Sequence, residues 1–227
     1  MSKIVSVGNI LIGGGNPVSI QSMTNTDTRN VKETVNQLKS LEEAGVDIVR
    51  LAVLDMEAAQ AIKEIKKQTK LPLIADIHFD YRLALESMKS GIDALRLNPG
   101  NIKDKDKVKE VIKEAKQRDL TIRVGVNGGS LDRAIYKEVN AQNMVKSASE
   151  HIKLMEDLNF TNIKVSLKAS DIKTTIEANT LFREKFDYPI HLGVTEAGTL
   201  RSSLIKSTSA LSYLLMQGIG DTIRYSI

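Results

Sequence analysis

The sequence predicts a (β/α)8 barrel, and three observations support this prediction. From residue 18 onward, β-like segments and helical patterns alternate with little interruption. Eight β-like segments separated by seven helical patterns favour a closed parallel barrel. One motif also recurs, because residues 45–51 (GVDIVRL) return as residues 91–97 (GIDALRL). An open doubly wound sheet is the alternative, but the glycine fingerprint of a dinucleotide-binding unit is missing.

The composition is that of one globular domain with a substantial core. The chain has 227 residues, of which 41% are hydrophobic and 26% charged. Its net charge is +4, but acids are interleaved with the basic residues, which argues against nucleic-acid binding. The chain has no cysteine, which excludes disulfides and thiolate metal ligands. No signal-peptide core or membrane-spanning run is found, so we expect a soluble cytoplasmic protein.

The N-terminal residues predict a β-hairpin. Residues 4–12 and 18–21 are β-like and flank residues 13–17 (GGGNP). Gly and Asn adopt positive φ, so this cluster is predicted as the hairpin turn. A phosphate-binding loop is the alternative, but the Walker sequence is absent.

The barrel elements then follow in order. Strands are predicted over residues 18–23, 48–53, 71–78, 94–98, 121–127, 163–168, 190–195 and 222–227. Helices with apolar residues at three- and four-residue spacing are predicted from Asp27 or Thr28, from Asp55, over 80–89 and 103–118, at the end of 131–158, over 171–186 and over 198–217.

The sequence ends after the eighth strand, without an eighth helix. The apolar side of that strand (Ile223, Tyr225 and Ile227) would therefore lack a cover. We therefore expect residues 1–227 to form one barrel domain of a truncated chain.

Alternate residues of the predicted strands are polar, although strands covered on both faces are normally apolar throughout. The polar positions are Gln21, Arg50, Asp76, His78, Arg96, Asn98, Arg123, Asn127, Ser166, Lys168, His191, Thr195, Arg224 and Ser226. If the apolar positions face the helices, these face the barrel interior. Most of them fall late in their strands, at the end where barrel active sites lie.

The charge expected at this mouth is strongly positive. The cations are Arg50, Arg96, Arg123, Lys168 and Arg224. Asp76 and Glu196 are the acids, too few to pair with all of these bases. Arginine binds phosphate oxygens in bidentate fashion, so the surplus favours a polyanionic ligand with two phosphates. A set of interior ion pairs is the alternative.

The three histidines and Glu196 need individual interpretation, because each side chain has either a functional or a structural role. His78, which shares a strand face with Asp76, is either a proton donor or phosphate contact, or a structural group. His191 is interpreted as structural and His151 as a surface residue. Glu196 is either a general acid or an acid at a helix start. A metal site is disfavoured because no further ligand is suitably spaced.

Several of these stretches carry a family resemblance. They are residues 19–24 (SIQSMT), 76–79 (DIHF), 96–101 (RLNPGN), 123–127 (RVGVN), 192–198 (LGVTEAG) and 220–224 (GDTIR). Over essentially its whole length the chain resembles the 4-hydroxy-3-methylbut-2-enyl diphosphate synthase family.

The resemblance implies an N-terminal barrel joined to a C-terminal domain that holds a [4Fe–4S] cluster. It implies reductive ring opening and dehydroxylation of 2-C-methyl-D-erythritol 2,4-cyclodiphosphate, a step of non-mevalonate isoprenoid biosynthesis. It also implies electrons from flavodoxin or ferredoxin, and a homodimer in which one subunit's cluster domain caps the partner's barrel. The residues that match the family's diphosphate-binding set are Arg50, His78, Arg96, Arg123, Lys168, Arg224 and Ser226, with Asn98, Asn127 and Ser166 as further polar contacts. Glu196 matches the catalytic acid.

The chain departs from the family in its lack of cysteine, since the family's cluster ligands are three cysteines and a glutamate of the C-terminal domain. The hypothesis is that this chain binds the cyclodiphosphate without a cluster and is inactive alone. Two alternatives stay open. One is a dihydropteroate synthase-like barrel, which would need a pterin pocket, and the other is a non-catalytic phosphate-binding barrel.

Overall fold

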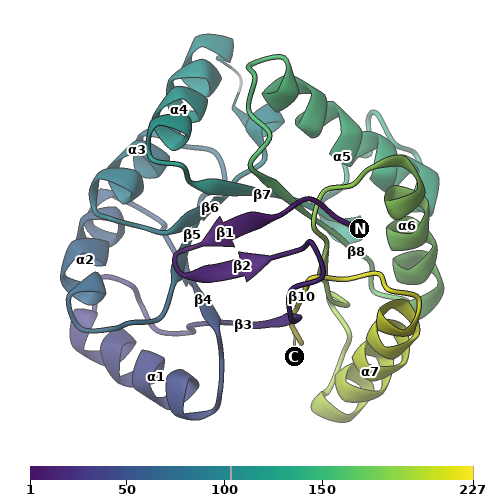
Figure 1. The fold of residues 1–227 in the computed structure, drawn as a ribbon, viewed down its shortest axis with the longest axis horizontal. Helices are drawn as coiled ribbons and strands as arrows, with labels where there is room; N and C mark the ends of the chain where they lie inside the picture. The colour runs from purple at the N-terminus through teal and green to yellow at the C-terminus, as the bar shows by residue number, and fades with distance from the viewer. Residues whose placement is uncertain (103, 227) are drawn as a thin grey trace.

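The computed structural model describes residues 1–102 and 104–226, and in these residues eight parallel strands form a barrel inside a ring of seven helices (Figure 1). The strands are β3 (Ser19–Met23), β4 (Ile48–Ala52), β5 (Leu73–Asp76), β6 (Ala94–Arg96), β7 (Thr121–Asn127), β8 (Ile163–Lys168), β9 (His191–Leu192) and β10 (Thr222–Ile223). Their order is β8-β7-β6-β5-β4-β3-β10-β9. A bridge between Val165 and Ile190 brings β8 against β9 and closes the ring. The predicted fold class is confirmed.

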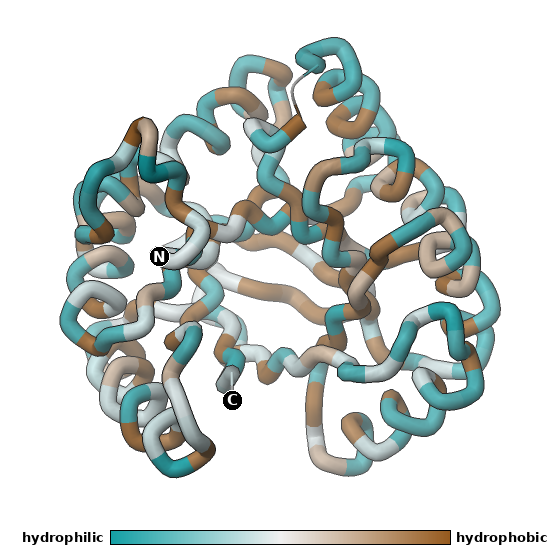
Figure 2. The backbone as a smooth tube through the Cα atoms, turned by 180° about the vertical axis from the view of Figure 1, so that it is seen from behind, coloured by the Kyte–Doolittle hydropathy of each residue, from teal (hydrophilic) through white to brown (hydrophobic). Residues whose placement is uncertain are grey.

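The helices alternate with the strands and cover the outside of the barrel (Figure 1). They are α1 (Val31–Glu43), α2 (Met56–Lys66), α3 (Tyr81–Lys89), α4 (Lys105–Gln117), α5 (Ala141–Glu156), α6 (Ile172–Lys185) and α7 (Leu200–Met216), with short 3-10 turns η1 (Pro99–Asn101) and η2 (Gly128–Ser130). Figure 2 shows hydrophobic residues along the central strands, and hydrophilic and hydrophobic residues alternating along the helices. Buried side chains such as Val124 and Ile152 form one continuous layer between strands and helices.

The start of α1 differs from the prediction. Its N-cap is Asn30, whose side chain accepts a hydrogen bond from the amide of Glu33 at 3.2 Å. Asp27 and Thr28, the predicted caps, have other partners: the carboxylate of Asp27 binds Arg29, and Thr28 Oγ1 donates to the carbonyl of Ala52 at 2.6 Å. Helix α1 therefore begins later in the sequence than predicted.

Several strands are shorter than predicted, because their last polar residues leave the hydrogen-bonded ladder and enter loops. His78 and Asn98 lie beyond β5 and β6, and Thr195 lies beyond β9. The expected start of the fourth helix at Lys103 and the expected strand end at Ile227 lie outside the described residues.

The N-terminal hairpin exists, but its turn was wrongly placed. It consists of β1 (Val5–Val7) and β2 (Ile10–Ile12), with Val7 opposite Ile10 across a two-residue loop. Gly8 supplies the positive φ, 58°, at the first loop position. Residues 13–15 also have positive φ, but they connect the hairpin to β3. A Cβ at Gly13 would collide with the carbonyl of Lys3.

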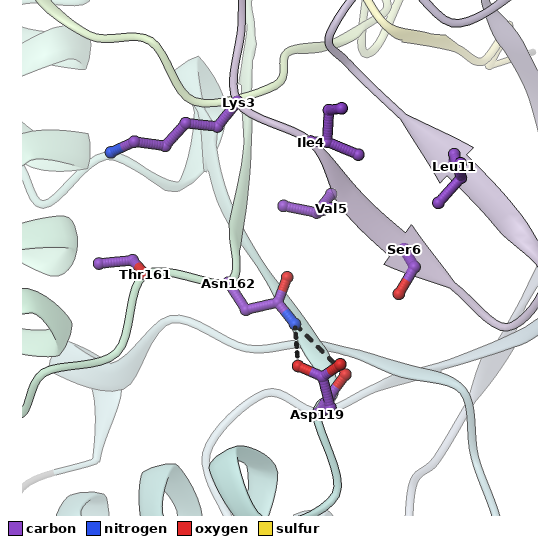
Figure 3. A pocket seen from close by; sticks show the side chains of 8 residues that line it. All are labelled: Lys3, Ile4, Val5, Ser6, Leu11, Asp119, Thr161 and Asn162. Atoms are coloured by element: carbon purple, nitrogen blue, oxygen red, sulfur yellow. Dashed lines mark hydrogen bonds between the residues drawn. The ribbon is translucent and has the colours of Figure 1, made fainter.

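The hairpin closes the amino-terminal end of the barrel. Its inward residues Val5, Val7 and Ile12 pack against Ile48, Ile74 and Ala94 of the barrel interior. Thr121 Oγ1 also donates to the carbonyl of Ser6 at 2.6 Å. A surface groove of about 460 Å³ lies beside the hairpin, where the side chain of Asn162 binds Asp119 (Figure 3). The open mouth is therefore at the carboxyl ends of the strands.

One side of the barrel has little helical cover, between α7 and α1 (Figure 1). Here the outward side chain of Ile20 is 46% exposed and that of Tyr225 is 37% exposed, while Ile223 is half-buried. The incomplete cover expected for Ile223 and Tyr225 is found. None of the helices in the described residues is both long and apolar enough to cross a membrane.

Candidate anion-binding site

Cationic side chains from five positions around the barrel converge at the mouth. Arg50 comes from β4, Arg96 from β6, Arg123 from β7, Lys168 from β8, and Arg224 from the residue after β10. We call these five residues the cation cluster. They line one small cavity of about 40 Å³, together with Gly125, Asn127, Ser166, Thr195 and Ser226. The interior position predicted from strand alternation is therefore correct for these residues.

Asp76 supplies the carboxylate of this cluster. Its oxygens lie 3.3 Å from Arg96 Nη1 and 3.6 Å from Arg50 Nε. Among the described residues, no carboxylate lies within ion-pair distance of Arg123, Lys168 or Arg224. Three buried or half-buried cations thus lack a negative partner, which is costly unless an anion binds.

Burial, and then the like charges of the neighbouring cations, lower the pKa values of the cluster. Burial lowers the pKa of Arg123 well below its usual value, and the neighbouring Arg50 and Arg96 lower it further. Burial, then Arg123 and Arg224, likewise hold the pKa of Lys168 well below the usual lysine value. The pKa of Arg224 falls to about 10, mainly through burial and then through Arg50. An anion in the cavity would oppose each of these shifts, because it favours the charged form of its neighbours.

The Lys168 ammonium has room because Gly193, directly after β9, has no side chain. A Cβ at Gly193 would lie 2.7 Å from Lys168 Nζ. In the described residues this ammonium has neither a hydrogen-bond acceptor nor a carboxylate, although the lysine is almost fully buried. It is therefore available to a ligand in the cavity.

His191 lies beneath the cluster and is fully buried. Its Nδ1 is 3.2 Å from Arg123 Nη1. A guanidinium only donates, so Nδ1 accepts and the ring proton is on Nε2. Burial, with Lys168 and Arg123, lowers the pKa of His191 far below its usual value, which keeps the ring neutral. These contacts agree with the structural interpretation of His191.

Other buried polar groups in the interior lack protein partners. Within the described part of the chain these include Arg96 Nε, Arg123 Nε, His191 Nε2 and both amide atoms of Gln21. Buried polar groups are normally hydrogen-bonded, so this interior suits a highly polar ligand.

The remaining predicted contacts occupy different places. Asn127, Ser166 and Ser226 line the cavity of the cation cluster. His78 is at the rim, half-exposed, with Nε2 3.8 Å from the Asp76 carboxylate. Asn98 is close by, but its amide pairs with the backbone of Gly125, donating to the carbonyl and accepting from the N–H, both at 2.8 Å. Its side chain therefore supports the wall of the site.

Glu196 is exposed at the rim, after β9, and is held in the left-handed backbone region with φ 51°. Its carboxylate packs against the backbone of Gly129, which has no side chain. A Cβ at Gly129 would lie 2.7 Å from Glu196 Oε1. The N-cap of α7 is Thr199, so Glu196 does not cap that helix. Left-handed conformations of residues other than glycine are strained and cluster at functional sites.

Two residues near the site were missed or misplaced by sequence reasoning. Lys164 is fully buried one layer below the cluster, with Nζ 3.5 Å from Thr222 Oγ1. Burial, then Arg123, lowers its pKa to about 7. The two-residue alternation that identified Ser166 and Lys168 would have found it.

His151 was predicted at the surface, which is wrong. It is partly buried and lines a cavity of about 500 Å³ that adjoins the mouth and also contains Arg96 and His78. Its Nδ1 accepts a hydrogen bond from the amide of Gly100 at 3.1 Å. The η1 turn packs on the polar face of α5 and covers His151. The spacing of apolar residues in the sequence shows which face of a helix is polar, but not whether another segment covers that face.

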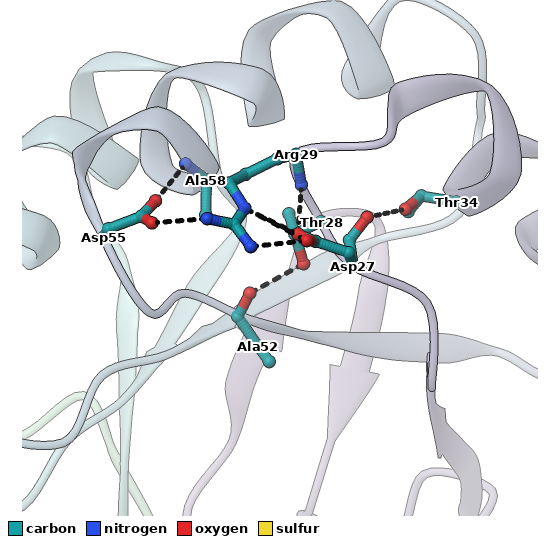
Figure 4. Close-up of polar contacts among 7 residues, drawn as sticks. All are labelled: Asp27, Thr28, Arg29, Thr34, Ala52, Asp55 and Ala58. Atoms are coloured by element: carbon teal, nitrogen blue, oxygen red, sulfur yellow. Dashed lines mark hydrogen bonds and ion pairs between the residues drawn. The ribbon is translucent and has the colours of Figure 1, made fainter.

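An ion-pair network ties two loops of the rim together (Figure 4). Arg29 Nη2 lies 2.6 Å from the carboxylate of Asp27, and Arg29 Nη1 lies 3.1 Å from that of Asp55. These carboxylates raise the pKa of Arg29 above its usual value. The network joins the loop before α1 to the loop before α2, and it was not foreseen from the sequence.

The fold and the site together define a TIM barrel with a cationic mouth at the carboxyl ends of its strands. The family model of the GcpE TIM-barrel domain matches residues 2–227. The chain belongs to this family.

Curated relatives agree with this assignment. The chain is 56% identical over 229 residues to the 4-hydroxy-3-methylbut-2-en-1-yl diphosphate synthase (flavodoxin) of Ruminiclostridium cellulolyticum, covering 100% of this chain and 65% of that protein. It is 53% identical to the protein of the same name from Thermodesulfovibrio yellowstonii, covering 100% of this chain and 66% of that protein. The chain thus spans about 65% of the length of the curated relatives it matches.

Solved structures with low sequence identity share the fold. Dihydropteroate synthase from Yersinia pestis has a TM-score of 0.73 at 12% identity, over 99% of this chain and 92% of that chain. Dihydropteroate synthase from Stenotrophomonas maltophilia has a TM-score of 0.73 at 15% identity, over 98% of this chain and 92% of that chain. At these identities the likeness concerns the fold alone.

Proposed function

We propose that this chain is the substrate-binding barrel of a flavodoxin-dependent 4-hydroxy-3-methylbut-2-enyl diphosphate synthase. The enzyme would be an oxidoreductase of non-mevalonate isoprenoid biosynthesis in the cytoplasm, with residues 1–227 as one domain of a longer two-domain protein. The observation that carries the proposal is the cation cluster, in which a single carboxylate of the described residues, Asp76, faces five cations. The printed names of the curated relatives support the same activity.

The proposed substrate is 2-C-methyl-D-erythritol 2,4-cyclodiphosphate, whose two phosphates carry two negative charges. Arg123, Lys168 and Arg224 lack carboxylate partners among the described residues, so they are the groups we assign to the diphosphate. Guanidinium groups bind phosphate oxygens through paired hydrogen bonds, and an ammonium acts as a compact charge. Arg50 and Arg96 are held by Asp76 and add further cationic contacts, Arg96 from the strand beside that of Arg123.

Glu196 is the proposed catalytic acid. Ring opening and loss of a hydroxyl as water consume two electrons and one proton, and the electrons would come from reduced flavodoxin or ferredoxin. A carboxyl group at the rim can deliver that proton to the departing oxygen. Its exposure, its strained backbone and its place beside the cavity support this role.

The residues of this chain do not fit an iron–sulfur cluster. The sequence has no cysteine, and in the described residues no group of three or more His, Asp or Glu side chains is arranged to hold a metal ion. The chain's own part is to bind the diphosphate and to hold the acid.

A second domain, from a partner subunit of a homodimer, is proposed to cover the mouth. Large apolar side chains are exposed on separate loops around it: Leu54 is 74% exposed, Phe79 70% and Ile135 62%. Exposed apolar residues around a polar cleft are typical of a surface that another domain covers.

The test is calorimetric titration of the chain with the cyclodiphosphate at two salt concentrations. Wild type should bind with an affinity that falls as salt rises, because the contacts are ionic. Arg224→Gln, in the half-buried part of the cluster, should weaken binding at least tenfold, or about 1.4 kcal/mol. Lys113→Gln, which removes a charge on the exposed face of α4, is the matched control and should bind like wild type.

Two results would contradict the proposal. One is equal binding by wild type and Arg224→Gln, which would place the ligand elsewhere. The other is saturable binding of a pterin without binding of the cyclodiphosphate, which would favour the dihydropteroate synthase-like alternative.

A further inference from the structure

A contact between two distant segments closes one wall of the mouth. The amide of Gly100, in η1, donates a hydrogen bond to His151 Nδ1, in α5, at 3.1 Å. The approach is close because residue 100 has no side chain, since a Cβ there would lie 2.7 Å from His151 Cε1. The helix thus holds the turn through one specific nitrogen of the imidazole.

The held turn is continuous with the wall of the cation cluster. Asn98 directly precedes η1, and its side-chain amide pairs with both backbone groups of Gly125. A Cβ at Gly125 would lie 3.3 Å from Arg96 Nε and 3.1 Å from Ser166 Oγ, so this backbone touches the ligand-facing groups. A shift of the turn would therefore move the backbone on which the Arg96 guanidinium rests.

We propose that His151 is a positioning residue, whose unprotonated Nδ1 holds residues 98–101 in the conformation that binds the cyclic diphosphate. The inference rests on the proposed function for the identity of the ligand. An imidazolium carries a proton on both nitrogens and accepts no hydrogen bond. Protonation of His151 therefore removes the acceptor of Gly100 and releases the turn.

The charged surroundings favour the neutral ring near neutral pH. Burial lowers the pKa of His151, Glu150 on its own helix opposes this shift, and Arg96 from β6 adds to it. His78 and Asp132 also line the shared cavity, on the loops after β5 and η2. The contact is thus expected at neutral pH and lost in acid, with loss of ligand affinity.

The first experiment is titration with 2-C-methyl-D-erythritol 2,4-cyclodiphosphate between about pH 5 and pH 8, where histidine titrates. The phosphates of this ligand are esterified and keep their charge over that range. His151→Ala should bind about tenfold more weakly than wild type at neutral pH, as expected for a lost hydrogen bond and a loosened turn. His151→Asn should bind like wild type, because Asn Oδ1 can take the place of the accepting nitrogen.

The pH profile separates His151 from the other histidine at the mouth. Wild-type affinity should fall in acid, and His151→Asn should lose that fall because its acceptor does not titrate. His78→Asn should keep the fall. If the fall is instead lost only in His78→Asn, or if His151→Asn binds as weakly as His151→Ala, the inference is wrong.

The second experiment needs no ligand. Hydrogen exchange of the segment that contains Gly100 should be faster in His151→Ala than in wild type, and unchanged in His151→Asn. Exchange that is equal in all three proteins would overturn the inference. If wild type does not bind the cyclodiphosphate, the proposed function fails, whereas the exchange data still decide whether His151 holds the turn.

Discussion

Arg123 and His191 form a hydrogen bond in the barrel interior, with 3.2 Å between Arg123 Nη1 and His191 Nδ1. Both side chains are buried, and burial together with neighbouring cations lowers the pKa of each. The neutral ring thus orients a guanidinium that has no carboxylate partner among the described residues. This pair supports the centre of the cation cluster.

The first prediction concerns this pair. His191→Leu keeps the bulk of the ring but leaves the Arg123 N–H without its acceptor, which should lower the free energy of unfolding by about 2 kcal/mol. His191→Asn, which keeps an acceptor, should lose less. Urea unfolding of the three proteins measures both effects. Equal stability of His191→Leu and wild type would show that the hydrogen bond does not support the barrel.

The second prediction concerns Lys164, whose folded-state pKa is lowered to about 7 mainly by burial. Its unfolded pKa is about 10.4, so between these values the unfolded chain binds more protons and stability rises with pH. Lys164→Met removes the buried charge and should raise the free energy of unfolding at pH 6 by about 2 kcal/mol. Urea unfolding from about pH 6 to pH 10 should show a steeper rise for wild type than for Lys164→Met.

Exposed Lys113→Met serves as the control for this second prediction, since it removes a solvated charge of the same kind. It should reproduce the pH profile of wild type. A Lys164→Met protein with an unchanged pH profile would contradict the lowered pKa of Lys164.

The sequence predicted the barrel and the residues of the cation cluster because both depend on local patterns. Two-residue alternation identified the inward position of Arg96 and Arg123, and the carboxyl ends of parallel strands necessarily meet at one mouth. Features that depend on contacts between distant segments were not visible. The cover of His151 by η1 is one such contact, and the packing of the Glu196 carboxylate on Gly129 is another.

Local competition explains the other differences. The three glycines at residues 13–15 are a stronger sequence pattern for a turn than the single Gly8. Of these four glycines, however, only Gly8 lies in the loop between the paired strands β1 and β2. Asp27 is a good cap by residue type, but its carboxylate is taken by Arg29, and the cap falls on Asn30. Residue type alone does not rank such alternatives.

The third prediction concerns Lys168, which lies in the crowded part of the cluster with a pKa well below its usual value, through burial and then Arg123 and Arg224. Lys168→Met should stabilise the ligand-free chain by about 1 kcal/mol or more, because a buried like-charge neighbour is removed. The same change should weaken cyclodiphosphate binding at least tenfold, or about 1.4 kcal/mol. Urea unfolding and calorimetric titration measure the two effects. If Lys168→Met is less stable than wild type and still binds the cyclodiphosphate as tightly, then Lys168 does not contact the ligand.

The last prediction separates binding from proton delivery at Glu196. Glu196→Gln should bind the cyclodiphosphate like wild type in this chain, because the carboxylate is outside the cation cluster. In the complete enzyme it should lower kcat by about a hundredfold or more, as is usual for loss of a general acid.

Glu196→Gly tests the backbone at the same position. It should raise the free energy of unfolding by about 1 kcal/mol, because glycine adopts the φ of 51° without strain. A gain in stability together with lost turnover would mean that the strained residue is kept for chemistry. Full turnover by both variants, measured with reduced flavodoxin as donor, would exclude Glu196 as the acid and leave the barrel with a binding role alone.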